Sequence, residues 1–556
     1  IYNESYSMWG GNTLSTMAGQ FAHVYAFCFL FLALGFLYEG LKEKRLSIWG
    51  VLFLSAVALS HAYVFLIVPV FFACFFVFAK RSEWASYFKI LVAVGVLSLL
   101  LSMWFIYPMI DNNKWTTPLP MVWGFNGILE SFTSAVVIPV WVALAVCLVL
   151  IWIRPLKIYR KTIVRHLIFW MVPTLVYCGL FFVFPKIGLV DARAIPQVQL
   201  FLCVLVGYLA GAIFEKLVPR FVGVALVLPL LLGMVWWADA HVFNFPNWAK
   251  WNYESWPKKR PYLELMKMMA SMRPGFSEPR VVFEHNDISN QSGTIRVFEM
   301  LPYFASRSTT ESLYTQASIL SPEAFHLQAE VSMTPSCPFR DFRCPQRSFA
   351  TVRQKFDLLA VDHLIAITDE TNQRATNSGF LNRVGNFGPW TLYKSIDNIR
   401  YAKILKGQAR VIPYDKNWRQ EFYSWFDNYS GEENWLVANM GNDPSSFVQA
   451  IKNNQIEDCE IFVKMDFFGF DFKTSCPGVP HLIKVAYHDN LKAQDGSPAY
   501  LVSPGMIGFV PQSNETRFTF GESIGWNMSV WLSWLCLFGL IFIRIRKPEL
   551  LTMEKR

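Results

Sequence analysis

Charged and polar side chains stand beside the long apolar runs of this sequence, where a ligand that is part lipid and part polar would meet them. Side chains at such a boundary can line a cavity that is open to both lipid and water. A carboxylate there can take a proton from an attacking hydroxyl, and a cation can stabilise the charge that grows on a departing phosphate. The candidate residues are Glu4, Trp9 and Asn12 near the start of the chain, His61 within a long run, Asp111 and Lys114 after the next run, and Asp191 and Arg193 before a later run.

The stretch VDARAIP, which contains Asp191 and Arg193, introduces an expected helix whose N-terminus favours anions. Structural roles stay open beside these: Asp191 and Arg193 as an exposed ion pair worth under about 1 kcal/mol, His61 as a helix cap, and Glu4 as a solvated loop acid.

The composition predicts an integral membrane protein. Hydrophobic residues make up 53% of the 556 residues and charged residues 16%, a balance typical of a chain that is part membrane domain and part soluble domain. A hydrocarbon core of roughly 30 Å needs about 20 apolar residues in a helix. Seven of the eight runs without Lys, Arg, Asp or Glu fit one crossing each; the runs are 21–38, 47–79, 90–110, 131–153, 167–185, 194–214, 221–238 and 523–543.

The run 47–79 is too long for a single upright helix, with 33 residues. Ser60-His61 interrupts it, so it is either one tilted helix or two short helices that turn near His61. With two crossings, the short loops place 16 Lys and Arg residues on one side of the membrane and three on the other, as the positive-inside rule requires. With one crossing, the basic cluster at 42–45 and the next basic loop would lie on opposite sides of the membrane, against the same rule. Nine crossings therefore fit the sequence better.

This topology predicts a multi-pass protein of the cell inner or plasma membrane. Residues 1–20, 111–130, 186–193 and about 240–522 would lie outside the cytoplasm, and the C-terminus inside it. The net charge of +9 then follows from the cytoplasmic loops, and we expect membrane lipid but no nucleic acid as a partner. The chain begins with Ile1, which we interpret as the start of a fragment or processed product.

The fold class we expect is a polytopic α-helical membrane domain joined to a large extracytoplasmic α/β and β-sandwich domain. We expect strands at RVVFEH, HLIAITD and WTLYKS and a helix at ESLYTQASIL. Alternation of period two between turn residues after residue 458 predicts an antiparallel sandwich. The expected parts are a multi-helix membrane domain at 1–240, an α/β domain at 241–400, a β-rich domain at 401–522, and a last helix with a cytoplasmic tail at 523–556.

Four of the ten Cys residues fall in the expected extracytoplasmic domain. An even number of Cys in an oxidising compartment predicts disulfides, here two local ones. Four buried free thiols are the alternative, and a zinc site fits the spacing less well. The expected bridges join Cys337 to Cys344 and Cys459 to Cys476.

Several stretches together resemble the bacterial membrane proteins described as "6-pyruvoyl-tetrahydropterin synthase-related", whose architecture is similar to that of GT-C glycosyltransferases and YfhO-like proteins. The stretches span most of the chain. They are ESYSMWGGNTLSTMAGQF (4–21), SHAY (60–63), DARAIPQVQLFLCVLVGYLAG (191–211), GTIRVFEMLPYFASRSTTESLYTQAS (293–318), LLAVDHLIAITDE (358–370) and PGVPHLIKVAYHDNLKAQDGSPAYLVSPGMIGFVPQ (477–512).

The resemblance implies transfer of a sugar from a polyprenyl-phosphate donor to an acceptor outside the cytoplasm, a cell-envelope glycan or a glycoprotein. In such enzymes a carboxylate of the first outer loop is the base, and cations or a metal hold the phosphate. On that pattern Arg193 would be the first candidate for the donor phosphate, because a guanidinium can bond two phosphate oxygens at once, and His61 and Lys114 would be secondary candidates. Whether this chain needs a metal stays open. The usual acid would precede Ile1, which leaves Glu4 or Asp111 as substitutes.

On the same resemblance, Trp9, Asn12 and Asp191 would line the substrate cavity, with Trp9 offering a face for stacking. Whether the chain is an enzyme stays open at this point, because the usual acid is not among its residues. The rival interpretation is a non-catalytic scaffold or assembly subunit that binds partner membrane subunits.

Overall fold

The computed structural model divides the chain into two compact units, which we name the helical unit and the sheet unit. The helical unit comprises residues 1–111, 120–254 and 524–556, and the sheet unit comprises 112–119 and 255–523, so the chain passes between them four times. The structure describes residues 10–11, 15–16, 20–119, 138–150, 160–217, 219–241, 259–272, 275–292, 294–311, 315–339, 341–441 and 443–546. Glu4, Trp9 and Asn12 lie outside the described residues.

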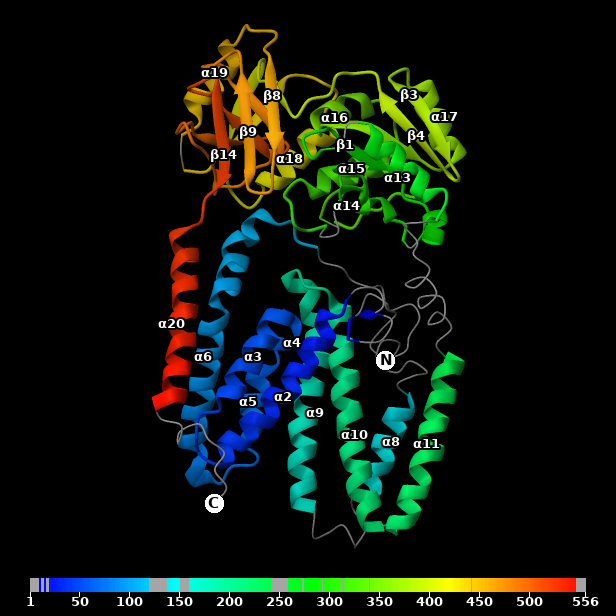
Figure 1. Ribbon diagram of the computed structural model, residues 1–556, viewed down its shortest axis with the longest axis vertical. Helices are drawn as coiled ribbons and strands as arrows, with labels where there is room; N and C mark the ends of the chain where they lie inside the picture. The colour runs from blue at the N-terminus through cyan, green and yellow to red at the C-terminus, as the bar shows by residue number, and fades with distance from the viewer. Residues whose placement is uncertain are drawn as a thin grey trace. The chain divides into compact units, whose positions relative to one another are not determined.

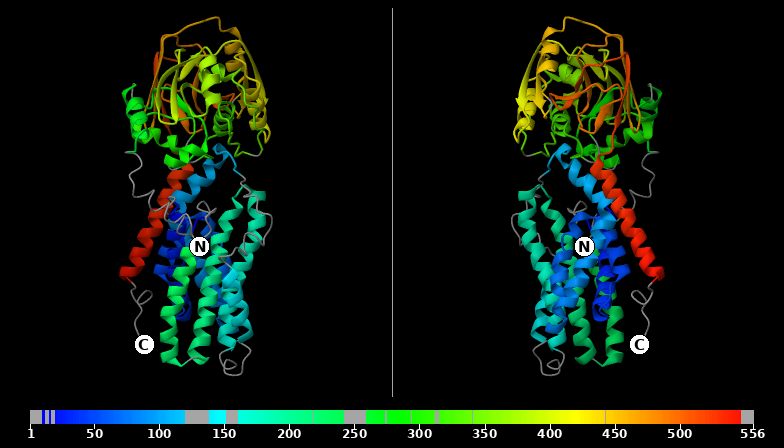
Figure 2. Two further views of the ribbon diagram at one scale, coloured as in Figure 1. Left: turned by 90° about the vertical axis from the view of Figure 1, so that its right-hand side faces the viewer. Right: turned by 90° about the vertical axis from the view of Figure 1, so that its left-hand side faces the viewer.

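The helical unit is a bundle of apolar helices packed side by side (Figures 1 and 2). Among the described residues, five helical stretches are long and apolar enough to cross a membrane: Ala22–Lys42, Arg81–Trp115, Lys161–Ile187, Asp191–Glu215 and Ile524–Ile545. The chain is therefore a membrane protein with a separate sheet unit, while nine crossings stay a prediction. The helices are α2 (Ala22–Lys42), α3 (Ile48–Ser60), α4 (Ala62–Phe65), α5 (Val68–Phe75), α6 (Trp84–Asp111), α8 (Ile138–Leu150), α9 (Arg160–Val183), α10 (Ile195–Leu217), α11 (Arg220–His241) and α20 (Ile524–Arg546).

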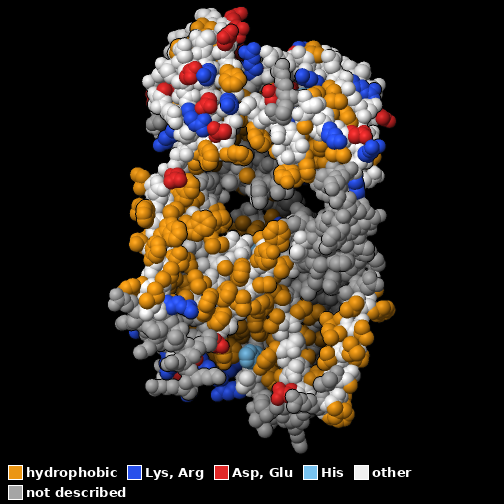
Figure 3. All heavy atoms as spheres, in the orientation of Figure 1, with side chains coloured by type: hydrophobic (Ala, Val, Ile, Leu, Met, Phe, Trp, Pro, Cys, Tyr) orange, Lys and Arg blue, Asp and Glu red, His pale blue; other side chains and the backbone are white. Residues whose placement is uncertain are grey.

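Large apolar side chains cover the outer surface of these helices (Figure 3). Phe88, Val149, Phe221 and Trp531 are each more than half exposed. In water such a surface would be an aggregation hazard, whereas hydrocarbon solvates it at no cost.

The apolar run 47–79 reverses direction at His61. His61 has an extended backbone (φ −159°, ψ 111°) that ends α3 and precedes α4. Its ring stacks on His23 at the N-terminal end of α2, with centroids 4.1 Å apart. Both ends of the run return to the other end of α2, because Trp49 contacts Phe36 and Phe78 contacts Tyr38. The break predicted at His61 is thus confirmed, and the segment is a helical hairpin roughly 20 Å deep at 1.5 Å per residue.

The basic loops gather at the end of the bundle opposite to His61. Lys44 pairs with Glu83 at 3.4 Å, joining the turn after α2 to the turn before α6. The guanidinium of Arg544 lies over the Trp49 ring at 5.6 Å. Charge is therefore segregated along the bundle, with one strongly basic end.

The last helix, α20, packs along α6 although the two are more than 400 residues apart in sequence (Figure 1). The Ser533 hydroxyl donates to the Leu100 carbonyl at 2.7 Å and accepts the Trp104 N–H at 3.1 Å. Gly525 permits the close approach, since a Cβ there would lie 2.0 Å from the Tyr107 hydroxyl oxygen.

The first part of the sheet unit is a four-stranded sheet with helices on both faces. The strand order is β1-β2-β4-β3, with β1 parallel to β2 and the other pairs antiparallel. Val281 and Phe283 join the core on the side of α13, whereas Val282 joins the core of α16, as strand alternation requires. The elements are β1 (Arg280–Phe283), β2 (Val361–Ala366), β3 (Leu381–Phe387), β4 (Trp390–Ser395), α13 (Tyr262–Ser271), α14 (Leu301–Ala305), α16 (Val352–Leu358) and α17 (Asp369–Asn377).

The second part contains two sheets that pack against each other through aromatic residues with edge-to-face contacts. Phe509 lies 4.9 Å from both Phe472 and Phe518 of the opposite sheet. The sheet orders are β5-β10-β13-β12-β7-β6 and β11-β14-β9-β8, antiparallel except for the parallel pair β6 and β7. The elements are β5 (Ala402–Ile404), β6 (Gln408–Pro413), α18 (Trp418–Asp427), β7 (Asn434–Asn439), α19 (Ser445–Asn453), β8 (Ile461–Met465), β9 (Gly469–Thr474), β10 (His481–Ala486), β11 (Leu491–Ala493), β12 (Ala499–Val502), β13 (Met506–Phe509) and β14 (Glu515–Phe520).

The two parts share a hydrophobic core, so they form one unit. Val282 and Leu364 of the first part belong to the same buried cluster as Leu482 and Val502 of the second. The strands predicted at RVVFEH, HLIAITD and WTLYKS are confirmed, but the helix predicted at ESLYTQASIL is wrong for the described residues 315–320. The helix α15 begins after them, at Ser321, because Pro322 fits the first turn of a helix.

All eleven residues of α15 (Ser321–Val331) are buried, including five polar ones. The Glu330 carboxylate accepts from the Lys355 ammonium at 2.6 Å, and Lys355 also lies 3.0 Å from His326. Breaking such a buried pair costs more than forming it gains, because the remaining charge is left without a partner. Glu323 differs, since burial raises its pKa to about 8 while Arg419 lowers it.

Both expected disulfides are present, Cys337 to Cys344 and Cys459 to Cys476. The other six Cys residues are free. We expect alkylation of the unreduced, denatured protein to label six thiols and alkylation after reduction to label ten, as counted by intact mass. Ten labelled thiols without reduction would contradict the two bridges.

Glu323→Gln should remove a pH dependence of stability. Between pH 4.5 and about 8, Glu323 is protonated in the folded protein and ionised in the unfolded chain. The free energy of unfolding therefore falls as pH rises through that window. Between pH 5 and pH 8, we expect the free energy of unfolding of the wild type to fall by a few kcal/mol relative to that of the variant, since one pKa unit corresponds to about 1.4 kcal/mol. Thermal unfolding of the protein in detergent measures this.

Glu515→Gln is the matched control, because Glu515 is 66% exposed. The same pH profile in the wild type and in Glu323→Gln would show that Glu323 is not held protonated.

Candidate functional site

Polar side chains from three segments meet at the end of the bundle opposite to the basic loops. We call this group the polar cluster and define it as His23 of α2, His61, Arg193 of the short helix Asp191–Ala194, and Gln197 of α10, with Gln20 and Tyr63 beside them. His23 is 1% exposed and Gln197 is fully buried. The cluster is therefore held inside the bundle rather than on its rim.

The two imidazole rings are stacked nearly parallel, with an interplanar angle of 16°. The Nε2 atom of His23 lies 3.1 Å from the amide nitrogen of Gln197. Because that amide nitrogen is a donor, His23 accepts the hydrogen bond through Nε2. This bond fixes the tautomer of His23, so that its Nδ1 carries the proton.

Arg193 brings a positive charge into the cluster. Its Nη1 donates to the Gln20 side-chain oxygen, a neutral acceptor. Within the described part of the chain, no carboxylate lies within ion-pair distance of its guanidinium. Arg193 is close enough to both imidazoles to act on them electrostatically. A cation held this way is costly unless an anion neutralises it.

Three buried polar atoms of the cluster have no hydrogen-bond partner among the described residues: Nδ1 of His23, Nδ1 of His61 and the amide oxygen of Gln197. The great majority of buried polar atoms in proteins have a hydrogen-bond partner, which is another protein group, a water molecule or a ligand. The cluster thus has capacity for a polar ligand that donates and accepts hydrogen bonds.

The backbone around Arg193 is held from two sides. The Tyr63 hydroxyl accepts the Val190 N–H at 2.8 Å, and the Tyr177 hydroxyl donates to the Tyr63 carbonyl. Asp191 is buried, and its carboxylate accepts the Ala192 N–H at 2.6 Å. These bonds place Arg193 at the entry to α10, where the positive end of the helix dipole adds to its charge.

His61, Asp191 and Arg193 were predicted to share one site, and the structure brings them together. His61 is the C-cap residue of α3, where its backbone N–H donates to the Val57 carbonyl, and its ring stacks on His23. Asp111 ends α6, and no hydrogen bond or ion pair among the described residues links it to the cluster.

The structure places Lys114 in the sheet unit. Its ammonium pairs with Asp489 at 2.5 Å, and the neighbouring Trp115 donates its indole N–H to the same carboxylate at 2.9 Å. Trp115 is 4% exposed and belongs to a core of this unit. The segment 112–119 is therefore built into the sheet unit, and the Asp489 carboxylate holds Lys114 and Trp115 there.

Sequence reasoning missed His23, Gln20 and Gln197. Each stands at the edge of an apolar run that was defined by the absence of Lys, Arg, Asp and Glu, which ignores His and Gln. Two polar residues within the run, Gln197 and Gln199, were the available signal. A polar residue in a membrane helix usually faces a partner or a cavity.

No group of three His, Cys, Asp or Glu side chains with metal-binding geometry occurs in the described part of the chain. The cluster supplies two imidazoles, a guanidinium and amides. Its net character is that of a donor-rich, positively charged site.

Comparison with known proteins gives no match: no protein-family model, curated protein or solved structure matches this chain. The geometry of the cluster is therefore the basis for assigning a function.

Gly10→Ala should disturb the cluster directly. Gly10 has φ +87°, and a Cβ there would lie 2.2 Å from Nδ1 of His23 and 2.9 Å from Nη1 of Arg193. We expect a loss of about 1–3 kcal/mol from the strained backbone and displaced rings, seen as a lower unfolding temperature in detergent.

Gly35→Ala is the matched control, since a Cβ at this glycine of α2 meets nothing within 4 Å. It should be neutral or slightly stabilising. Equal effects of the two substitutions would mean that Gly10 does not lie against the His23 ring.

Proposed function

We propose that this chain is a membrane glycosyltransferase of GT-C type that transfers a sugar from a polyprenyl-phosphate donor to an extracytoplasmic acceptor, a cell-envelope glycan or glycoprotein. The polar cluster binds the donor phosphate at the outer end of the helices. The sheet unit lies outside the cytoplasm and the C-terminus inside it, because the positive-inside rule assigns the basic end of the bundle to the cytoplasm.

One observation carries the proposal: Arg193 is charged, lies among buried polar groups and has no carboxylate partner among the described residues. A phosphate supplies the missing negative charge and accepts from Nη and imidazole N–H groups. The start of α10 adds further donors. A lipid phosphate is favoured over a soluble one, since the surrounding helices expose apolar side chains such as Phe182 and Phe21.

Arg193 would act in two ways in this proposal. It holds the donor in place, and it stabilises the negative charge that grows on the phosphate as the bond to the sugar breaks. The base for the acceptor hydroxyl would be Glu4 or Asp111. The proton that this carboxylate takes leaves the acceptor oxygen as that oxygen attacks the sugar.

The second candidate is a lipid-binding scaffold or assembly subunit without transfer activity, working with partner membrane subunits. The position of Asp111 favours it, because no described contact joins this carboxylate to the cluster. In that case the cluster would bind a phosphate-headed lipid and the sheet unit would bind partners.

The test compares the binding of polyprenyl phosphate with that of polyprenol, which lacks the phosphate, by native mass spectrometry of the full chain. We expect Arg193→Ala to weaken phosphate-dependent binding about tenfold to a hundredfold, the range for a lost hydrogen bond to a charged group. Arg193→Lys should recover part of this binding, because Lys keeps the positive charge but cannot bond two phosphate oxygens in the bidentate geometry of a guanidinium.

Arg45→Ala is the matched control, since Arg45 lies at the other end of α2 and pairs with Glu43. Turnover of a labelled polyprenyl-phosphate sugar then separates the two candidates: binding with transfer supports the enzyme, and binding without transfer supports the scaffold. Equal binding of the phosphate and the alcohol would refute both.

A further inference from the structure

A second site-like feature lies wholly within the sheet unit, between α18 and the strands β6 and β7. Strand β6 is parallel to β7, and α18 connects them as a crossover helix. The cavity has a volume of about 530 Å³, within the range of small-molecule sites. We call it the α18 groove; it is lined by Arg410, Asn417, Gln420, Glu421, Ser424, Trp425, Asn428, Tyr429, Ser430, Glu432, Asn434 and Leu436.

The amphipathic character of α18 creates one wall of the groove. Its Trp418, Phe422 and Phe426 are buried in the unit. The opposite face presents Gln420 and Ser424, which are exposed. This polar face is open to water, as is usual for a helix at a protein surface, and β6 and the loop after α18 border it, which makes it the wall of a groove.

The groove combines aromatic surface with amides and hydroxyls. Trp425 is partly exposed and is fixed by its indole N–H, which donates to the Asn434 carbonyl. Tyr429 lies 4.9 Å from it and Trp435 lies 5.5 Å away. Because this hydrogen bond and the two neighbouring rings hold the indole in place, it offers a rigid apolar surface and loses little rotamer entropy when a ligand binds.

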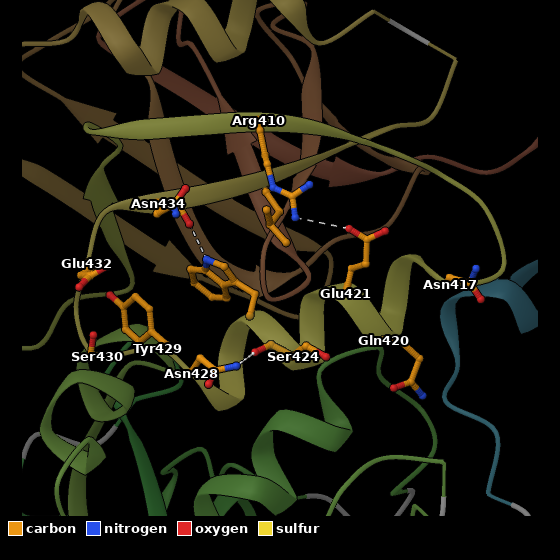
Figure 4. Close-up of a pocket in the computed structure, with 12 residues that line it drawn as sticks. Arg410, Asn417, Gln420, Glu421, Ser424, Asn428, Tyr429, Ser430, Glu432 and Asn434 are labelled. Carbon is orange, nitrogen blue, oxygen red and sulfur yellow. Dashed lines mark hydrogen bonds and ion pairs between the residues drawn. The ribbon is translucent and has the colours of Figure 1, made fainter.

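Figure 4 shows Arg410 of β6 and Glu421 of α18 pointing toward each other across the groove. Their charged groups are 3.6 Å apart. Glu432 adds a second carboxylate, so the lining carries one positive and two negative charges. This balance disfavours phosphates and other anions.

We propose that the α18 groove binds a neutral oligosaccharide. Sugar hydroxyls both donate and accept hydrogen bonds, as the amides of Asn417, Asn428 and Asn434 do. The apolar C–H face of a sugar ring matches the surface of Trp425. The inference does not rest on the lipid-phosphate proposal, because all groove residues belong to the sheet unit.

An extended peptide added to β6 is a different occupant, since β6 is an edge strand of its sheet. Oligosaccharide is favoured because Pro413 in β6 lacks an N–H for pairing and Arg410 sits on the same strand. The lining also offers side-chain amides, which a peptide that pairs with β6 through its backbone would not need.

The test is a titration of the full chain in lipid nanodiscs with neutral oligosaccharides of glucose, mannose and N-acetylglucosamine, followed by calorimetry and ligand-observed NMR. We expect at least one of them to bind, and both Trp425→Ala and Asn434→Ala to weaken that binding about tenfold or more. Asn434→Ala removes only an exposed amide, so it keeps the test valid if Trp425→Ala fails to fold.

Tyr303→Ala is the control, because Tyr303 is 78% exposed elsewhere on the same unit. It should leave oligosaccharide binding unchanged. The proposal is overturned if no neutral oligosaccharide binds the wild type, if Asn434→Ala binds as tightly as the wild type, or if only extended peptides bind the groove.

Discussion

A guanidinium surrounded by buried groups needs an anion, and this requirement organises the helical unit. Arg193 donates to the neutral oxygen of Gln20 and acts electrostatically on two imidazoles. The described carboxylate nearest in sequence, Asp191, accepts a backbone N–H at the helix start. The fold keeps the guanidinium in place with several bonds to the backbone around it. A guanidinium held this firmly, with no carboxylate partner among the described residues, is typical of a binding site rather than of packing.

The hairpin at His61 explains how the site is built. Because the run 47–79 turns back after one short helix, a histidine reaches the end of α2 at the level of His23 and Arg193. Gly10 approaches the same rings with its backbone. Three segments far apart in sequence therefore meet at one depth, opposite to the basic end of the bundle. In the sheet unit the segment 112–119 has a comparable structural role, since Trp115 enters a core formed by much later residues.

Much of this fold can be predicted from local patterns. Hydropathy located the helices, the break at His61 followed from a polar pair inside an apolar run, and period-two alternation located most strands of the second half. The two disulfides followed from the even number of Cys in the expected extracytoplasmic part. The start of α15 was missed, because the apolar residues before Ser321 resemble a helix while Pro322 decides where it begins.

The site was predicted only in part, for physical reasons. Charged residues stand out in an apolar sequence, so Arg193 and Asp191 could be recognised, and His61 marked a turn. His23 and Gln197 carry no permanent charge, and their role depends on helix packing that no spacing encodes. Lys114 looked like a phosphate ligand because it follows an apolar run, yet its partner Asp489 is 375 residues away.

The most direct test of the central claim is an experimental structure of the chain in nanodiscs that contain polyprenyl phosphate. The account predicts density for a phosphate in contact with Arg193 and within hydrogen-bond distance of a His23 or His61 ring. A carboxylate of this chain paired with Arg193, with the lipid phosphate bound elsewhere or not at all, would contradict it.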